Sequence, residues 1–148
     1  MKVGLVLPLF SGEPERVLAF AERAERLGFD GVFAFDHLFP PGASADRPSL
    51  EAFSMLSAVA ARTERIAVGT LVTRATLRSA GMIAKLAASV DGVSHGRMIL
   101  AVGTGDPIDE PEHRVFGIPY LDKAERRDHL VETVRAVRAL FDARPWPG

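Results

Sequence analysis

The segment that decides the fold is Phe33-Ala34-Phe35-Asp36-His37-Leu38-Phe39 (FAFDHLF), and two prolines follow it directly. The apolar run 31–35 has the composition of a buried strand, and prolines do not continue a central strand. The sequence therefore places an acid and an imidazole next to each other at the point where a strand ends.

Apolar stretches alternate with amphipathic stretches along the rest of the chain. We predict strands at 2–8, 31–35, 66–72 and 98–102, and helices at 14–27, 49–63, 79–91 and 123–142. Such an alternation indicates an α/β fold with a parallel four-stranded sheet covered by helices. Right-handed crossovers bring the carboxyl ends of the strands to one edge, where α/β folds bind their ligands. The 148 residues are predicted to form a single domain, 1–148.

Capping and helix-breaking residues predict where these elements begin and end. Ser49 is predicted to be the N-cap of the second helix. Residues 104–122 contain three prolines and are predicted to be a long loop. The tail 144–148, which contains two prolines, is expected to end the last helix.

Composition excludes several classes of function. The net charge is −1 with both signs mixed along the chain, so no nucleic-acid partner is predicted. There is neither a basic amphipathic stretch for a membrane surface nor an apolar run long enough to cross a membrane. The absence of cysteine fits a cytoplasmic protein. We predict that the opening MKVGLVLPLF is a core strand and not a signal peptide, because Pro8 interrupts its apolar run.

Polar residues gather at the predicted carboxyl edge of the sheet. They are Asp36 and His37 after the second strand, Thr70 and Thr73 around the third, and Thr104 and Asp106 after the fourth. A histidine beside a carboxylate is a common arrangement for general acid–base catalysis. The structural alternative is that Asp36 caps the following turn and that His37 packs half-buried against Phe33 or Phe39.

Two glycine- and threonine-rich segments are ambiguous by themselves. Gly103-Thr104-Gly105-Asp106 lacks the third glycine of a dinucleotide-binding fingerprint. It is either a tight turn or a place where a flat ligand approaches the backbone. Thr70-Leu71-Val72-Thr73 has the composition of a core strand. No two histidines have metal-ligand spacing together with a carboxylate, so no metal site is predicted.

Four stretches together resemble a known family. They are Lys2–Pro8, Phe35-Asp36-His37-Leu38, RIAVGTLVTRATLR at 65–78 and DGVSHGRMILAVGTGD at 91–106. Their order and spacing resemble the N-terminal half of the luciferase-like monooxygenase superfamily, and in particular its members that use the 5-deazaflavin coenzyme F420. The segment Glu112–Gly117 is similar to the acidic segment ending in Phe-Gly of that family.

The resemblance implies a (βα)4 half of a TIM-type barrel that holds its cofactor at the strand carboxyl ends. It implies that His37 stands over the ring carbon that exchanges hydride, that Asp106 is a proton donor, and that the bond Leu71–Val72 is a cis peptide behind the ring. The cofactor-binding residues that it implies are Asp36, Thr70, Leu71, Val72, Thr73, Gly103, Thr104 and Gly105. Sugar-phosphate-oxidising members have a longer Glu in place of Asp106, which argues against a sugar-phosphate substrate.

Members of this family form eight-stranded barrels, whereas this chain supplies four strands. Three explanations are open: a homodimer, a separate partner chain with the second half, or a truncated or engineered fragment. We favour the homodimer, because apolar strands without the second half leave open sheet edges and an uncovered face. Arg74 and Arg78 are candidate phosphate contacts, and the alternative is that both are solvated surface residues.

The predicted function is that of an oxidoreductase that transfers a hydride between F420 and a small organic substrate. FMN is the alternative cofactor within the same family. A non-catalytic flavin- or deazaflavin-binding protein would use the same edge without a proton-transfer group. A purely structural fragment would need no cofactor, and the polar residues clustered at one edge argue against it.

Overall fold

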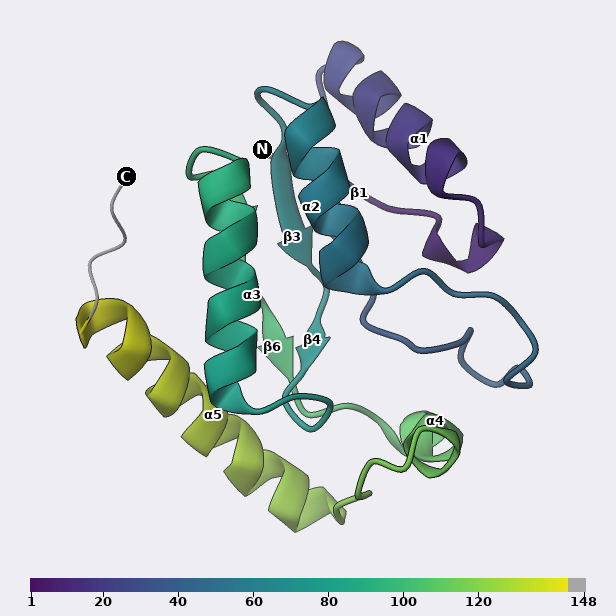
Figure 1. Cartoon of the computed structure of the whole chain (residues 1–148), viewed down its shortest axis with the longest axis vertical. Coiled ribbons are helices and arrows are strands. Elements are labelled where there is room, and N and C mark those ends of the chain that lie inside the picture. Colours follow the sequence, from purple (N-terminus) through teal and green to yellow (C-terminus); the bar gives the residue numbers. More distant parts are fainter. Residues whose placement is uncertain (144–148) are drawn as a thin grey trace.

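The computed structural model describes residues 1–143, so the tail 144–148 lies outside the described residues. Strands and helices alternate along the chain, with two short 3-10 turns and a short helix inserted (Figure 1). The elements are β1 (Gly4–Val6), η1 (Leu9–Ser11), α1 (Pro14–Arg26), β2 (Gly31–Ala34), α2 (Ala52–Arg62), β3 (Ala67–Thr70), β4 (Thr73–Arg74), α3 (Ala80–Val93), β5 (Met98–Ile99), β6 (Val102–Gly103), η2 (Pro107–Asp109), α4 (Glu110–Val115) and α5 (Lys123–Ala143). None of the helices in the described part is long and apolar enough to cross a membrane.

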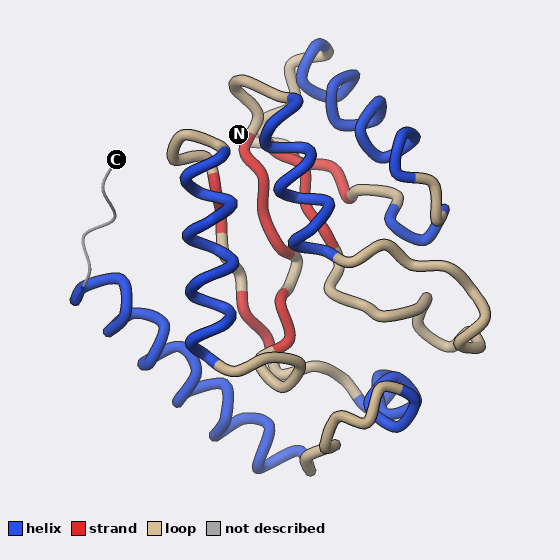
Figure 2. Tube along the Cα trace, viewed as in Figure 1, coloured by secondary structure: helices blue, strands red, loops and turns tan. Residues whose placement is uncertain are grey.

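The main sheet has the order β1-β2-β3-β5, and all its neighbouring strands are parallel. Beyond it, β4 and β6 pair as a second parallel ladder that continues β3 and β5 toward their carboxyl ends. Figure 2 shows α2 and α3 lying across one face of the strands, with α1 beside α2 and α5 beside α3. This topology confirms the predicted α/β half-barrel.

The core lies between the sheet and its covering helices. Val32 and Val68 are partners on neighbouring strands and are fully buried. They face apolar side chains of α2, of which Phe53 and Leu56 are among the largest fully buried residues. Burial of these side chains fixes which face of the sheet meets the helices, and it directs the alternate residues of each strand to the opposite face.

On that opposite face, a single aromatic ring fills the space above three glycines. Gly4 pairs with Gly31, and Phe33 pairs with Gly69, so all four residues share one face of the sheet. A Cβ atom at Gly4, Gly31 or Gly69 would lie within 2.9 Å of a ring carbon of Phe33. The ring of Phe33 therefore occupies space that side chains of the neighbouring strands would otherwise take.

The remainder of this face is apolar and open. Val6, which pairs with Phe33, is 37% exposed, and Ile99, which pairs with Gly69, is 47% exposed. Phe35, two residues after Phe33, is also exposed. Contiguous apolar residues at a surface commonly mark a contact with another part of a protein.

We expect Gly69→Ala to lower the free energy of unfolding by about 1–3 kcal/mol, because the new methyl group would overpack this face. Its Cβ would lie 2.6 Å from the carbonyl oxygen of Ile99, which is backbone and cannot rotate away. Gly81→Ala is the matched control: Gly81 belongs to α3, and apart from its chain neighbours and the backbone of its own helix no atom would lie within 4 Å of the new Cβ. Alanine there is expected to stabilise the chain by up to about 1 kcal/mol. Urea unfolding measures both changes, and equal effects of the two substitutions would contradict the packing argument.

Several predicted boundaries are wrong, each for a local reason. The third strand is interrupted after Thr70, and β4 resumes beyond the Leu71–Val72 bond, which is cis as the resemblance implies. The predicted loop 104–122 contains η2 and α4, because Pro107 and Pro111 occupy the first turns of these helices, where proline is tolerated. Glu51, and not Ser49, caps α2, and its carboxylate accepts hydrogen bonds from Phe53 N and Ser54 N.

Candidate active site

A cleft of about 330 Å³ opens at the carboxyl edge of the sheet. It is formed by the residues after β2, the β3–β4 junction, and the segment from β6 into η2. Eight of the predicted site residues line it, namely Asp36, His37, Leu71, Val72, Gly103, Thr104, Gly105 and Asp106. A second hollow of about 440 Å³ lies between α3 and α5, is largely apolar, and includes none of the predicted residues.

Thr70 and Thr73, the other two predicted residues, are buried and do not line the cleft. The hydroxyl of Thr70 donates a hydrogen bond to the carbonyl oxygen of Ala101 at 2.8 Å and accepts one from Ala101 N. Thr70 thereby connects β3 to the segment between β5 and β6. The hydroxyl of Thr73 has no hydrogen-bond partner among the described residues.

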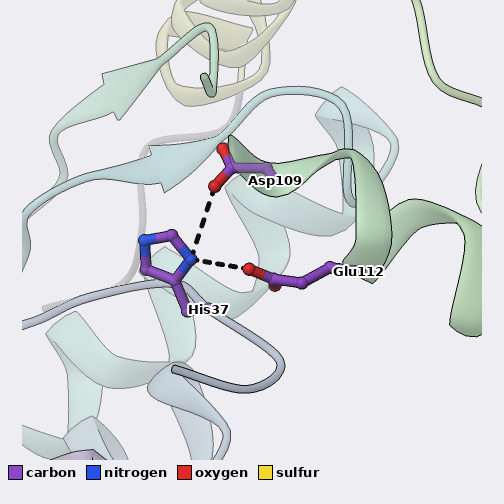
Figure 3. Close-up of side chains that lie close together, drawn as sticks. All are labelled: His37, Asp109 and Glu112. Carbon is purple, nitrogen blue, oxygen red and sulfur yellow. Dashed lines mark hydrogen bonds and ion pairs between the residues drawn. The ribbon is translucent and has the colours of Figure 1, made fainter. Parts of the chain in front are cut away.

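His37 stands at the cleft with one ring nitrogen held by the protein. Its Nδ1 lies 2.8 Å from Oε1 of Glu112 and 3.6 Å from Oδ1 of Asp109 (Figure 3). Phe10 and Phe35 stack on each other, and the imidazole meets both rings edge-on. The chain offers no hydrogen bond to Nε2 in its described part, so this nitrogen is available to a ligand.

Glu112 connects His37 to a buried arginine. Its side chain is 1% exposed, and its Oε2 accepts hydrogen bonds from Leu38 N at 2.6 Å and from Nη2 of Arg74 at 2.5 Å. Burial alone would raise the pKa of Glu112. The hydrogen bonds from His37 and Leu38 and the charge of Arg74 outweigh burial, so the pKa lies below its usual value. Glu112 is therefore an ionised acceptor at neutral pH.

Asp36 is buried and organises a second arginine. Nη1 and Nη2 of Arg78 bind its two carboxylate oxygens at 2.7 and 3.0 Å, and Arg74 N donates to Oδ2. Arg78 also binds Glu51 and lies 5.3 Å above the ring of Phe53. Burial alone would lower the pKa of Arg78, but the bonds to Asp36 raise it on balance.

The structure contradicts the interpretation of Arg74 and Arg78 as solvated surface residues. Arg74 is 3% exposed, its Nε donates to the carbonyl oxygen of Asp36, and its Nη2 binds Glu112. Each guanidinium is already bonded to carboxylates within the chain, so neither is a free cation for a phosphate.

The side chains of His37, Asp109 and Glu112 have ligand atoms within 4.8 Å of one another, which a metal site requires. The spacing of these residues in the sequence did not reveal their proximity, because Asp109 and Glu112 come from η2 and α4, far along the chain from His37. However, Nη1 of Arg74 lies 3.4 Å from Oδ2 of Asp109, and Nη2 binds Glu112. A guanidinium charge at these oxygens repels a metal cation, so we interpret the cluster as an ion-pair network.

The segment Gly103–Asp106 forms the floor and rim of the cleft. A Cβ at Gly103 would clash with Cγ2 of Val72, so a side chain at this position would force Val72 to shift. Gly105 has φ +74, a conformation that favours glycine. Asp106 is exposed at the rim, and its backbone N–H donates to Oδ2 of Asp109.

Residue patterns did not assign a role to Glu112, Asp109 or Phe10. The resemblance had marked the acidic segment that begins at Glu112, without indicating which group it contacts. Glu112 is 75 residues from His37 in the chain, and no local pattern reports a contact at that separation. His113, which falls within the predicted loop 104–122, is buried in α4, where Nδ1 contacts the carbonyl oxygen of Pro119.

Acid is expected to destabilise the chain through Glu112. Because its pKa in the folded chain lies below the usual value of about 4.5, its stabilisation is present above that pH and is lost as the pH falls through the lowered pKa. Urea unfolding between about pH 6 and about pH 3 measures the loss. Glu112→Gln, which has no group that titrates there, should be less stable at neutral pH but lose less stability in acid. Parallel curves for the two proteins would contradict this assignment.

Curated proteins of known name share sequence with this chain. Over 142 residues the chain is 34% identical to an F420-dependent glucose-6-phosphate dehydrogenase of Intrasporangium calvum; the match covers 95% of this chain and 42% of that protein. It is 36% identical over 129 residues to the protein of the same name from Beutenbergia cavernae, covering 86% and 37% of the two chains. The chain thus spans about two fifths of the length of these curated relatives.

Solved structures share the fold. An F420-dependent secondary alcohol dehydrogenase in complex with an F420–acetone adduct has a TM-score of 0.83 at 28% identity, covering 95% of this chain and 42% of that one. The monooxygenase RslO1 from Streptomyces bottropensis has a TM-score of 0.75 at 28% identity, covering 95% and 43%. The family model for luciferase-like monooxygenases matches residues 1–146. The chain therefore belongs to the luciferase-like monooxygenase family.

Proposed function

We propose that this chain provides the cofactor-facing half of an F420-dependent oxidoreductase that transfers a hydride between the deazaflavin and a small organic substrate. The observation that supports this most directly is His37, which lines the cleft: its Nδ1 is held by Glu112, and no group in the described part of the chain bonds its Nε2. The names of the relatives support F420 as the cofactor.

The cleft residues fit a flat heteroaromatic ring. Leu71 and Val72 supply apolar surface at the cis bond, and Gly103 and Gly105 keep the opposite backbone free of side chains. F420 supplies the acceptor or donor of the hydride when it is bound. We propose that Asp36 and the backbone of 103–105 border the ring.

The charges of the cleft suit the ring better than the phosphate-bearing end of a cofactor. Arg74 is the cation among the described cleft residues, and its guanidinium is bonded to Glu112. We propose that groups outside this half of the barrel hold the charged tail of F420. Asp106, exposed at the rim, is placed to serve as a second proton-transfer group.

The open apolar face supports the proposal that a second half-barrel covers it. Val6, Phe35 and Ile99 would be covered by strands on the other side of the barrel interior. We propose that a second copy of the chain or a separate half-barrel chain supplies these strands, with the homodimer preferred. Light scattering on the purified chain tests the homodimer, and a well-folded monomer would contradict it.

Fluorescence titration of the purified chain with F420, and separately with FMN, tests the cofactor. We expect saturable binding of F420 that is tighter than that of FMN. Leu71→Arg should weaken F420 binding, because it introduces a long charged side chain into the cleft. Leu140→Arg is the matched control: both leucines are partly exposed (44% and 38%), and Leu140 lines the hollow between α3 and α5. Tighter binding of FMN would favour the alternative cofactor, and binding of F420 without reduction of any substrate would favour a non-catalytic carrier.

A further inference from the structure

We propose that Glu112 is a positioning residue that sets the tautomer of His37, so that Nδ1 carries the proton and the lone pair of Nε2 faces the cleft. The catalytic consequence of this tautomer depends on the function proposed above. The tautomer itself is a property of the chain alone.

The other hydrogen bonds of Glu112 determine which group is the donor in the bond between His37 and Glu112. Oε2 already receives the backbone N–H of Leu38 and Nη2 of Arg74, and neither group is able to act as an acceptor. Oε1 lies 2.8 Å from Nδ1 of His37. An ionised carboxylate only accepts hydrogen bonds, so Nδ1 of the neutral ring has to be the donor. A histidine side chain free in water carries its proton mainly on Nε2, so Glu112 reverses the ordinary preference.

This tautomer suits oxidation of an alcohol. Under the proposed function, the substrate C–H bond would break and its electron pair would leave with the hydrogen as hydride, which bound oxidised F420 would accept. The O–H bond breaks, its proton moves to the lone pair of Nε2, and the C=O bond forms. Reduction of a carbonyl compound follows the same path in reverse, with the protonated Nε2 as the donor. A ring with its proton on Nε2 could not accept the hydroxyl proton there.

Glu112→Gln distinguishes this role from simple space filling, because the amide is nearly isosteric with the carboxylate. The amide oxygen should face Leu38 N and Arg74, since the opposite orientation would bring the amide NH₂ against two other donors. The NH₂ group would then face Nδ1 of His37 and donate to it. The variant is therefore expected to reverse the tautomer and place the proton on Nε2.

Asp109 provides the matched control. Oδ1 of Asp109 lies 3.6 Å from Nδ1 of His37, which is beyond hydrogen-bond distance. This Oδ1 atom has no hydrogen-bond partner in the described part of the chain. Asp109→Asn also removes one negative charge beside His37 and Arg74. It is expected to leave the tautomer of His37 unchanged.

The test is long-range proton–nitrogen NMR correlation of the full ¹⁵N-labelled chain without cofactor, at a pH where the ring is neutral. The His37 signals are assigned by their loss in His37→Ala. We expect protonated Nδ1 in the wild type and in Asp109→Asn, and protonated Nε2 in Glu112→Gln. Protonated Nε2 in the wild type, or an unchanged tautomer in a folded Glu112→Gln, would overturn the proposal.

Backbone amide spectra show whether Glu112→Gln folds, and if it does not, the wild-type tautomer decides the question. The NMR result stands even if F420 does not bind, so failure of the proposed function is distinguishable from failure of this inference.

If F420 does support turnover, Glu112→Gln should lower kcat about 10²- to 10⁴-fold with a smaller change in KM, as other acid-to-amide changes behind a catalytic histidine do. A turnover equal to that of the wild type would overturn the catalytic part.

Discussion

His37→Ala is expected to lower kcat about 10²- to 10⁴-fold, which is the usual contribution of a positioned acid–base group. The affinity for F420 should change by less than about threefold, because His37 moves a proton of the substrate and is one of many residues that border the cofactor. The substitution leaves Glu112 bonded to Leu38 and Arg74, so its carboxylate keeps partners and the fold should persist.

The measurement is the change in F420 absorbance with a panel of small alcohols, together with a fluorescence titration of F420 on the same samples. His95→Asn is the control, because His95 lies in the turn between α3 and β5, at the opposite edge of the sheet. Its backbone has φ 55, a conformation that asparagine tolerates well. Equal turnover in His37→Ala and the wild type would remove His37 from its assigned role.

Arg74→Met is expected to lower the free energy of unfolding by about 3–5 kcal/mol, because removal of one partner of a buried ion pair leaves an uncompensated buried charge. Without Arg74, Oε2 of Glu112 and the carbonyl oxygen of Asp36 each lose a buried donor, and Asp109 loses its nearby cation. Methionine is apolar and of similar length, so most of the packing volume is retained. A loss of this size is a large part of the stability of an ordinary domain.

Arg62→Met provides the comparison at the surface. Arg62 also binds a glutamate, Glu22, at 2.7 Å, but its side chain is 50% exposed and water screens the pair. Surface ion pairs contribute about 0–1 kcal/mol. Urea unfolding of both variants at neutral pH measures the difference through the transition midpoint and slope. Equal losses would show that burial does not determine the energy of the Arg74 network.

These two expectations concern a single chain of contacts. Arg74 holds Glu112, and Glu112 holds His37 at the cleft. Arg78 holds Asp36 beside them. A substitution at Arg74 should therefore affect both stability and the placement of His37, whereas His37→Ala should affect mainly turnover.

The sequence by itself determined the order of the elements and the edge at which the site lies. The apolar periodicity of 31–35 and 66–72 indicated buried parallel strands, and the right-handed crossovers brought their carboxyl ends together. This was enough to place Asp36, His37 and the 103–106 segment at one edge. The cis bond at Leu71–Val72 followed from the resemblance and not from periodicity.

Only the tertiary structure decided which charged groups meet. Glu112 contacts His37 across 75 residues, and Arg74 and Arg78 each reach carboxylates far away in sequence. Periodicity reports which face of an element is buried, but it carries no information about the partner of a charge, because ion pairing depends on distance in space. Residues 104–122 were predicted as loop from their prolines, yet they fold into η2 and α4 and bring Asp109 and Glu112 to the site. A buried charge requires a partner, and in this protein the fold brings the partners from separate segments to one place.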